Sequence, residues 1–399
     1  MQYTRGREPK LCGKEEIHMK KVLSFVLAVL MCAVCFTACS GTKADGKKLV
    51  LGATGPLTGD NASYGNSVKQ GAELAVKEIN AAGGINGITF ELLFEDDQCD
   101  PTAAVNGYNT MIDKGMQVSL GAVTSAACVA LTAEAKKDNM LMITPSGSQK
   151  ECTQYDNCFR VCFTDPDQGL YAADFIAEKK LAEKVAVLYD KSSDYSTGIT
   201  QNFLKRAAEK GLTVVAEQSY TDQSNTDFSV QLKAVKDSGA ELLFLPMYYS
   251  DAGLILTQAD SIGLETIFFG VDGMDGIIKQ MGADKANLTE GVMLLTPFAA
   301  DSSDEKTVNF VKAYKEAYNA TPDQFAADGY DAVYAVAAAL KETGITDTTV
   351  ADLSEKLIAA MTKITLEGTT GTMTWGADGE ASKSARAVII KDGAYQAYN

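Results

Sequence analysis

Residues 49–97 read LVLGATGPLTGDNASYGNSVKQGAELAVKEINAAGGINGITFELLFEDD. The short apolar runs at 49–53 and 88–94 predict two buried β-strands. Between them, apolar residues recur at helical spacing through 66–82, which predicts an amphipathic helix, and the glycine pair at 83–84 predicts its end. This succession of strand, glycine-rich loop, helix and strand begins a pattern that runs along the chain.

The same alternation continues to about residue 270. Further strands are predicted at 118–123, 140–144, 185–189, 214–217, 242–247 and 267–270, and further helices at 197–210, 228–237 and 252–262. Strands that alternate with helices on this scale form parallel sheets covered by helices on both faces. The sequence therefore predicts an α/β fold. The portion after residue 38 has about 360 residues, which suggests two domains.

The N-terminus has the features of a secretory leader. Met19, Lys20 and Lys21 precede about 15 apolar residues at 22–36, a run that is short for a transmembrane helix. The run ends in Phe36-Thr37-Ala38-Cys39, which looks like the cleavage and lipidation site of a lipoprotein. We expect 1–38 to be an upstream extension and lipoprotein signal peptide, Cys39 to carry the lipid, and 39–46 to be a tether. The alternative is a helix retained as a membrane anchor.

Charge and histidine content narrow the classes of function. Residues 1–38 hold six of the 36 basic and three of the 52 acidic residues, so 30 basic and 49 acidic residues remain, a net charge of −19. Such an acidic surface disfavours nucleic acid and anionic membranes as partners. The single histidine, His18, lies in the leader, so the remaining chain has no histidine-based triad or metal site. We expect no enzyme activity, no cofactor and no metal.

Five cysteines follow Cys39: Cys99, Cys128, Cys152, Cys158 and Cys162. Disulfides persist outside the cytoplasm, so two bridges and one free thiol are the simplest account. We expect the pairs Cys99–Cys128 and Cys152–Cys158, with Cys162 as a buried thiol. The alternative, that all five are reduced, stays open.

Polar and aromatic residues, with one glycine among them, follow several of the predicted strands. They are Tyr64, Ser125, Ser146, Gly147, Ser148, Tyr195, Tyr248 and Asp272. Ligands of open parallel sheets bind beyond the carboxyl ends of the strands, so we expect these residues to form one binding site. Ser125, at a predicted helix N-terminus, suits a carboxylate, and Asp272 suits an ammonium group. Each also has a structural alternative, because Ser125 can be a helix cap, Tyr248 a packing residue and Asp272 a turn residue.

Several sequence stretches together resemble a known family. They include Gly55-Pro56, Tyr64-Gly65, Ala75 to Asn80, Gly83-Gly84-Ile85, Asp96-Asp97, Cys99-Asp100-Pro101, Met142 to Pro145, Asp167-Gln168-Gly169, Gly270 to Gly273 and Ala327 to Ala332. The chain from about residue 47 onward resembles the substrate-binding proteins of branched-chain amino acid ABC transporters, which have the type I periplasmic binding protein fold.

The resemblance implies a fold, a site and a role. It implies two doubly wound parallel-sheet lobes joined by three hinge crossovers, and the pattern breaks near Asp165-Pro166, near Thr296-Pro297 and at 382–384 fit these crossovers. One lobe would comprise 47–164 and 297–383, the other 165–296 and 384–399.

In the family the positions of Ser125 and Ser146 to Ser148 hold the carboxylate. Those of Asp272 and Tyr248 hold the amine, and Tyr64 and Tyr195 match tyrosines that close over the ligand.

The resemblance also implies the partners. We expect an extracytoplasmic, lipid-anchored monomer that captures an amino acid, branched-chain or otherwise aliphatic, and delivers it to a membrane permease.

The sequence departs from the family at Asp272, where relatives have glutamate, and at Ser146-Gly147, where they are alanine-rich. Thr124 also occupies the usual place of a disulfide cysteine. The alternatives are a small amide, an aromatic or another carboxylate as ligand, or a sensory role in which the domain presents its ligand to a membrane receptor.

Overall fold

The computed structural model describes residues 47–398, so the predictions for the leader, His18 and the lipidated Cys39 lie outside the described residues. Its first sheet has five parallel strands in the order β2-β1-β3-β4-β5. Their bounds are β1 (Lys48–Gly55), β2 (Thr89–Asp96), β3 (Val118–Ala122), β4 (Met142–Thr144) and β5 (Cys158–Arg160). The apolar runs of the sequence form these strands because both faces of the sheet are covered, which buries consecutive side chains such as those of β3.

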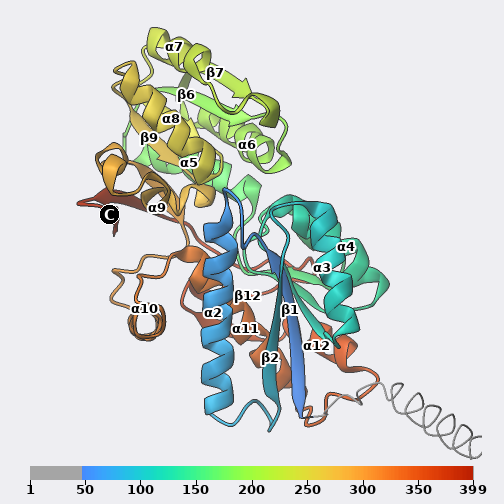
Figure 1. The fold of residues 1–399 in the computed structure, drawn as a ribbon. Helices are drawn as coiled ribbons and strands as arrows, with labels where there is room; N and C mark the ends of the chain where they lie inside the picture. The colour runs from blue at the N-terminus through green and yellow to red at the C-terminus, as the bar shows by residue number, and fades with distance from the viewer. Residues whose placement is uncertain (1–46, 399) are drawn as a thin grey trace, which may run out of the picture. The chain divides into compact units, whose positions relative to one another are not determined.

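Helices cover both faces of the first sheet (Figure 1). On one face pack α2 (Ala62–Ala81), α11 (Gln324–Thr343) and α12 (Leu353–Met361), and on the other pack α3 (Pro101–Asp113) and α4 (Ser125–Lys137). Two glycines permit close contact between α2 and α11: a Cβ on Gly71 would lie 1.9 Å from the Ala326 carbonyl oxygen, and one on Gly329 would lie 2.4 Å from that of Val68. The helix α10 (Glu305–Tyr318) and the hairpin β11 (Thr365–Gly368) with β12 (Gly371–Thr374) complete this part.

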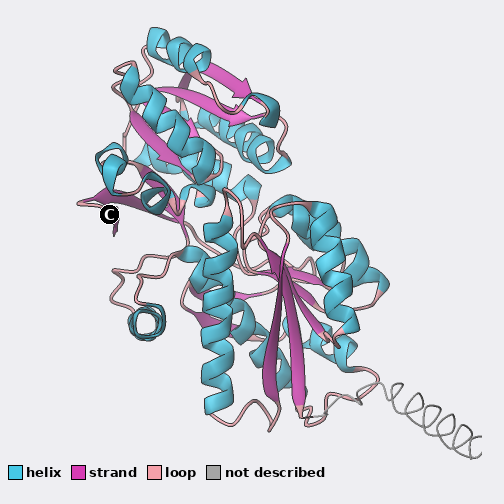
Figure 2. Ribbon diagram, viewed as in Figure 1, coloured by secondary structure: helices cyan, strands magenta, loops and turns pink. Residues whose placement is uncertain are grey.

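The second sheet has seven strands in the order β14-β13-β10-β9-β8-β6-β7. Five are parallel: β6 (Lys184–Asp190), β7 (Thr213–Tyr220), β8 (Leu242–Leu245), β9 (Ile267–Gly270) and β10 (Met293–Thr296). Two more, β13 (Arg386–Lys391) and β14 (Ala394–Ala397), extend one edge in antiparallel fashion. The helices of this part are α5 (Asp165–Glu178), α6 (Asp194–Lys210), α7 (Ser229–Ser238), α8 (Tyr249–Ser261) and α9 (Ile277–Met281). Figure 2 shows how helices and strands alternate through both sheets.

The predicted α/β fold with parallel sheets is confirmed. The chain passes between the two sheets three times, after β5, after β10 and after β12. These passages lie at the predicted pattern breaks, near Asp165-Pro166, near Thr296-Pro297 and at 382–384. At the first of them, Thr164 caps α5 and accepts a hydrogen bond from the Asp167 amide. Four short 3-10 segments connect larger elements: η1 (Lys150–Thr153), η2 (Asp222–Ser224), η3 (Asp272–Met274) and η4 (Ala283–Thr289). Within residues 47–398, no helix combines the length and hydropathy needed to cross a bilayer.

Neither predicted disulfide is formed, because all five cysteines of the described part are free thiols. Cys128 lies one turn inside α4, on the face that packs on the sheet, with Cys152 buried in the same cluster. Cys99 lies instead near the N-terminal end of α4, beside Thr124. Cys158 is buried in β5. Cys128, Cys152 and Cys158 share one buried cluster as thiols, and Cys162 is a buried thiol as predicted.

Candidate functional site

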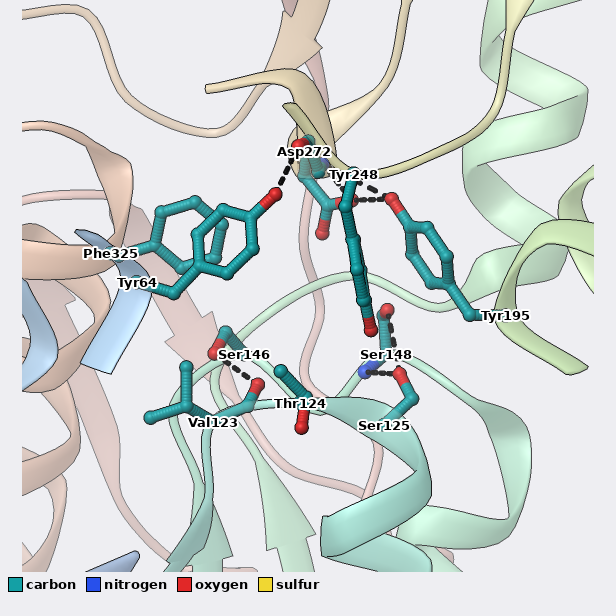
Figure 3. A pocket seen from close by; sticks show the side chains of 11 residues that line it. Tyr64, Val123, Thr124, Ser125, Ser146, Ser148, Tyr195, Tyr248, Asp272 and Phe325 are labelled. Carbon is teal, nitrogen blue, oxygen red and sulfur yellow. Dashed lines mark hydrogen bonds between the residues drawn. The ribbon is translucent and has the colours of Figure 1, made fainter. Parts of the chain in front are cut away.

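One pocket gathers seven of the eight residues predicted as a binding site (Figure 3). Tyr64, Ser125, Ser146 and Ser148 come from the part of the chain that builds the first sheet, and Tyr195, Tyr248 and Asp272 come from the part that builds the second. Val123, Thr124, Gly273 and Phe325 complete the lining. In this structure the side chains leave a cavity of only about 10 Å³, room for about one water molecule, so an amino acid requires them to move apart.

The serines cluster at the N-terminus of α4. The Ser125 hydroxyl accepts hydrogen bonds from the amides of Ser148 and Gln149, both at 3.2 Å, and lies 3.4 Å from the Ser148 hydroxyl. Thr124, which precedes α4, is 5% exposed, and its hydroxyl makes no hydrogen bond among the described residues. Unpaired N–H groups and the helix dipole make a helix N-terminus favourable for anions. This end of the pocket therefore has the chemistry of a carboxylate site.

A buried arginine holds the serine loop in place. Arg160 is fully buried, and its guanidinium donates to the carbonyl oxygens of Gly147, Gln149 and Lys150 at 3.0, 3.0 and 3.1 Å. Its Nε lies 2.9 Å from an oxygen of Glu380. Such a guanidinium can satisfy several carbonyl groups at once, because its five N–H donors have a rigid geometry. The loop is thus held by hydrogen bonds from within the protein.

Gly147, predicted as a binding residue, does not line the pocket. A Cβ at this position would lie 2.8 Å from Cys128 Sγ and 2.9 Å from Thr144 Oγ1. Its amide donates to Thr144 Oγ1 at 2.9 Å. Glycine at this position allows the loop to approach α4 and β4 closely, so its contribution is to the position of the neighbouring serines.

Asp272 presents one carboxylate oxygen to the other end of the pocket. Its Oδ1 accepts from the Tyr195 hydroxyl at 2.6 Å and from the Gly273 amide at 2.7 Å. The side chain of Gln168 also hydrogen-bonds the carboxylate, which lines the pocket. Burial raises the pKa of Asp272 to about 6, and the Tyr195 hydrogen bond partly opposes that rise. At neutral pH the carboxylate is mostly ionised and suits an ammonium group.

Two glutamines position the backbone of Asp272, and the sequence analysis did not identify them as site residues. Gln168 Oε1 accepts from the Asp272 amide at 3.1 Å. Gln324 Nε2 donates to the Asp272 carbonyl oxygen at 3.1 Å. Gln168 belongs to a stretch that carried the family resemblance. Gln324 directly follows Asp323, the N-cap of α11, and nothing in the local sequence marks it as a site residue.

The aromatic residues play different parts from those expected. The Tyr64 hydroxyl donates to the Gly273 carbonyl oxygen and accepts from the Tyr249 amide at 3.1 Å, so Tyr64 offers the pocket its ring. That ring packs on Phe325 and on Tyr248 with centroid distances of 4.5 and 5.5 Å. Phe325, which no local sequence pattern indicated, is a buried apolar wall.

Tyr248 reaches the serine end of the pocket rather than Asp272. Burial raises the pKa of its hydroxyl, and the backbone N–H of Ser125 partly opposes this rise, so the hydroxyl lies at the start of α4. Figure 3 shows the hydroxyl directed away from Asp272. The tyrosine that contacts Asp272 is Tyr195, whose ring packs on Tyr248 at a centroid distance of 5.0 Å.

Comparison with known proteins identifies the family. A family model described as periplasmic binding protein matches residues 48–394. The chain belongs to the periplasmic binding protein family. It is 31% identical to a leucine-, isoleucine-, valine-, threonine- and alanine-binding protein of Pseudomonas aeruginosa, over 84% of this chain and 87% of that protein.

Solved structures agree with this assignment. The substrate-binding protein LivJ of a branched-chain amino acid transporter from Streptococcus pneumoniae, in complex with isoleucine, matches with a TM-score of 0.80 and 29% identity, over 88% of this chain and 98% of that chain. The leucine-binding protein LivK of Thermotoga maritima matches with a TM-score of 0.78 and 27% identity, over the same shares of the two chains. The resemblance drawn from the sequence is therefore confirmed, and the family is one of solute-binding proteins.

Proposed function

We propose that this protein binds a small aliphatic amino acid as a zwitterion in the pocket of Figure 3. One observation carries the proposal: the two ends of a single small pocket have opposite electrostatic preferences. The N-terminus of α4, with the hydroxyls of Thr124 and Ser125, favours the carboxylate. The carboxylate of Asp272 favours the ammonium group.

The walls between these ends support an aliphatic side chain. Val123 and Phe325 are buried and apolar, and Tyr64 presents its ring to the same space. Burial of methyl groups against such walls contributes about 0.8 kcal/mol per CH₂. The names of the relatives, which include leucine-, isoleucine- and valine-binding proteins, support this class of ligand. Because the side chain of Asp272 is one methylene shorter than that of glutamate, it leaves more space beside the amine.

The role we propose is capture and delivery without chemical conversion. The two sheets with their helices would be the predicted lobes, 47–164 with 297–383 and 165–296 with 384–399, and their closure would bury the ligand. The closed protein would then dock on the permease of an ABC importer, while the lipid on Cys39 holds it at the outer face of the membrane. We expect it to act as a monomer.

A thermal-shift screen of the full chain in detergent tests the proposal. The panel contains the twenty amino acids, their decarboxylated and deaminated analogues, and small amides. A ligand that binds only the folded state at a hundredfold excess over its dissociation constant stabilises it by about 2.7 kcal/mol. We expect aliphatic amino acids to raise the melting temperature and their analogues to fail. A shift produced only by compounds without an ammonium group would refute the role of Asp272 and the ligand class.

A further inference from the structure

Two buried thiols meet behind the serine end of the pocket. Cys128 lies in α4, one turn after Ser125, on the face that packs on the sheet. Cys152 lies in η1, just after the serine loop of residues 146–148. Both cysteines are 0% exposed and belong to one buried cluster. Their side chains hydrogen-bond each other, so the two sulfur atoms are in direct contact.

Other contacts place the two sulfur atoms between the same two segments. Cys152 Sγ lies 3.8 Å from the Ser125 carbonyl oxygen, in the turn of α4 that leads to Cys128. Cys128 Sγ lies beside the backbone of Gly147, where an added Cβ would be 2.8 Å from it. Each sulfur therefore packs on the segment that carries the other. A disulfide between two neighbouring segments needs side chains that approach in this way.

This pair of thiols differs from both pairs predicted from the sequence. Cys158 belongs to the same cluster, but its thiol donates to the side-chain oxygen of Asn157 at 3.9 Å. Cys99 lies outside the cluster. The contact between Cys128 and Cys152 therefore makes these two residues the candidate dithiol of the described chain.

The two thiols differ in acidity. Burial acts to raise the pKa of the Cys128 thiol, but hydrogen bonds from Cys152 and Thr144 and the positive charge of Arg160 outweigh it, so this pKa lies below its ordinary value. Burial and the hydrogen bond to Cys128 raise the pKa of Cys152. Because the thiolate is the reactive form of cysteine, Cys128 has the chemistry of the attacking residue and Cys152 that of its partner.

We propose that Cys128 and Cys152 are a redox-active pair that closes to a disulfide and links the serine loop to α4. The oxidant is a small-molecule disulfide such as oxidised glutathione. The Cys128 thiolate attacks one of its sulfur atoms and releases one glutathione thiolate. Cys152 then loses its proton and attacks Cys128 Sγ of the mixed disulfide, which releases the second glutathione thiolate. Overall the two thiols give up two electrons and two protons, and one oxidised glutathione becomes two reduced molecules.

The disulfide would act on the carboxylate end of the pocket. It closes a loop of about 25 residues that contains β4 and the serine loop. Ser125 lies three residues before Cys128, and its hydroxyl accepts from the Ser148 amide at 3.2 Å. A crosslink beside this contact limits how far the two segments can separate. The inference goes beyond the proposed function, because the pair can close whatever ligand the pocket binds.

Oxidation of the full chain in detergent, followed by alkylation in denaturant and peptide mapping, tests the pair. One sample is oxidised as folded protein, and a second is refolded in the presence of oxidised glutathione, since both sulfur atoms are buried. We expect a Cys128–Cys152 crosslink that dithiothreitol reverses. The entropy of a loop of about 25 residues predicts that oxidation raises the melting temperature by roughly 5 °C.

Two variants separate this pair from the other thiols. Cys158→Ala removes a thiol of the same cluster and should keep both the crosslink and the rise in melting temperature. Cys152→Ser should lose both, while its melting temperature in reductant stays close to that of the reduced wild type. The proposal would be overturned by the absence of the crosslink in both samples, by a crosslink of Cys128 to another thiol, or by an unchanged melting temperature. Ligand binding is no part of these measurements, so failure of the proposed function would leave them intact.

Discussion

Replacing Asp272 with asparagine tests the central contact of the amino-acid pocket. The substitution keeps the shape of the side chain and an oxygen to accept from Tyr195 and the Gly273 amide. It removes the negative charge of the oxygen that faces the pocket. A hydrogen bond to a charged group contributes about 1.5–3 kcal/mol, so we expect the dissociation constant of the amino acid to rise roughly 10- to 150-fold.

The same substitution should affect stability in the opposite direction. The folded-state pKa of Asp272, about 6, lies above the value of about 4 in an unfolded chain. Stability from this group is therefore present at low pH and is lost as the pH rises through 6. At pH 8 the buried charge costs on the order of 1–3 kcal/mol, which asparagine avoids. The ligand-free variant should melt at a higher temperature than the wild type at pH 8, and at a similar temperature at pH 4.

Isothermal titration calorimetry at pH 8, together with thermal melts at pH 4 and 8, measures both effects. The matched control is Asp97→Asn, which also removes a buried carboxylate whose pKa is raised to about 6 but which does not line the pocket. It should change stability and leave affinity unchanged. Wild-type affinity in Asp272→Asn would show that this carboxylate does not hold the amine, and the assignment of the two ends of the pocket would fail.

Further predictions follow from the same contacts. Affinity for the amino acid should fall as the pH drops below about 6, because protonation of Asp272 removes the charge that holds the ammonium group; a flat profile from pH 8 to 5 would contradict this. Tyr195→Phe should move that loss of affinity to higher pH, since it removes a hydrogen bond that lowers the pKa of Asp272, and calorimetry across pH would detect the shift. Gly147→Ala should destabilise the protein by about 1–3 kcal/mol and weaken binding, with partial recovery in Gly147→Ala/Cys128→Ala, whereas a wild-type melting temperature would show that the loop has room for a methyl group.

The elements of the fold were readable from local patterns. Each apolar run predicted as a strand forms one, although β4 begins at Met142 rather than at residue 140. The helix predicted at 66–82 begins at Ala62. Apolar periodicity and glycine stops depend on neighbours within a few residues, so a sequence displays them directly. The antiparallel edge of β13 and β14 was not foreseen, since strand pairing depends on partners far along the chain.

The candidate site divides in the same way. Residues that directly follow strands were predicted from the sequence, because the carboxyl ends of parallel strands meet at one edge of a sheet. Phe325 and Gln324 lie about 50 residues beyond Asp272, at the start of α11, and nothing in their local sequence marks them. The thiols show the converse error, because two disulfides were predicted and all five cysteines of the described part are free.

The sequence by itself thus determined the α/β class, the order of the strands and helices, the family and the set of polar groups at strand ends. The tertiary structure decided that the Asp272 carboxylate lines the pocket, that Tyr195 rather than Tyr248 contacts it, and that Thr124 and Phe325 complete the lining. The physical reason is the distance along the chain over which each interaction acts. Backbone preference and apolar period act over a few residues, whereas burial, hydrogen-bond partners and the resulting pKa values depend on groups that only folding brings together.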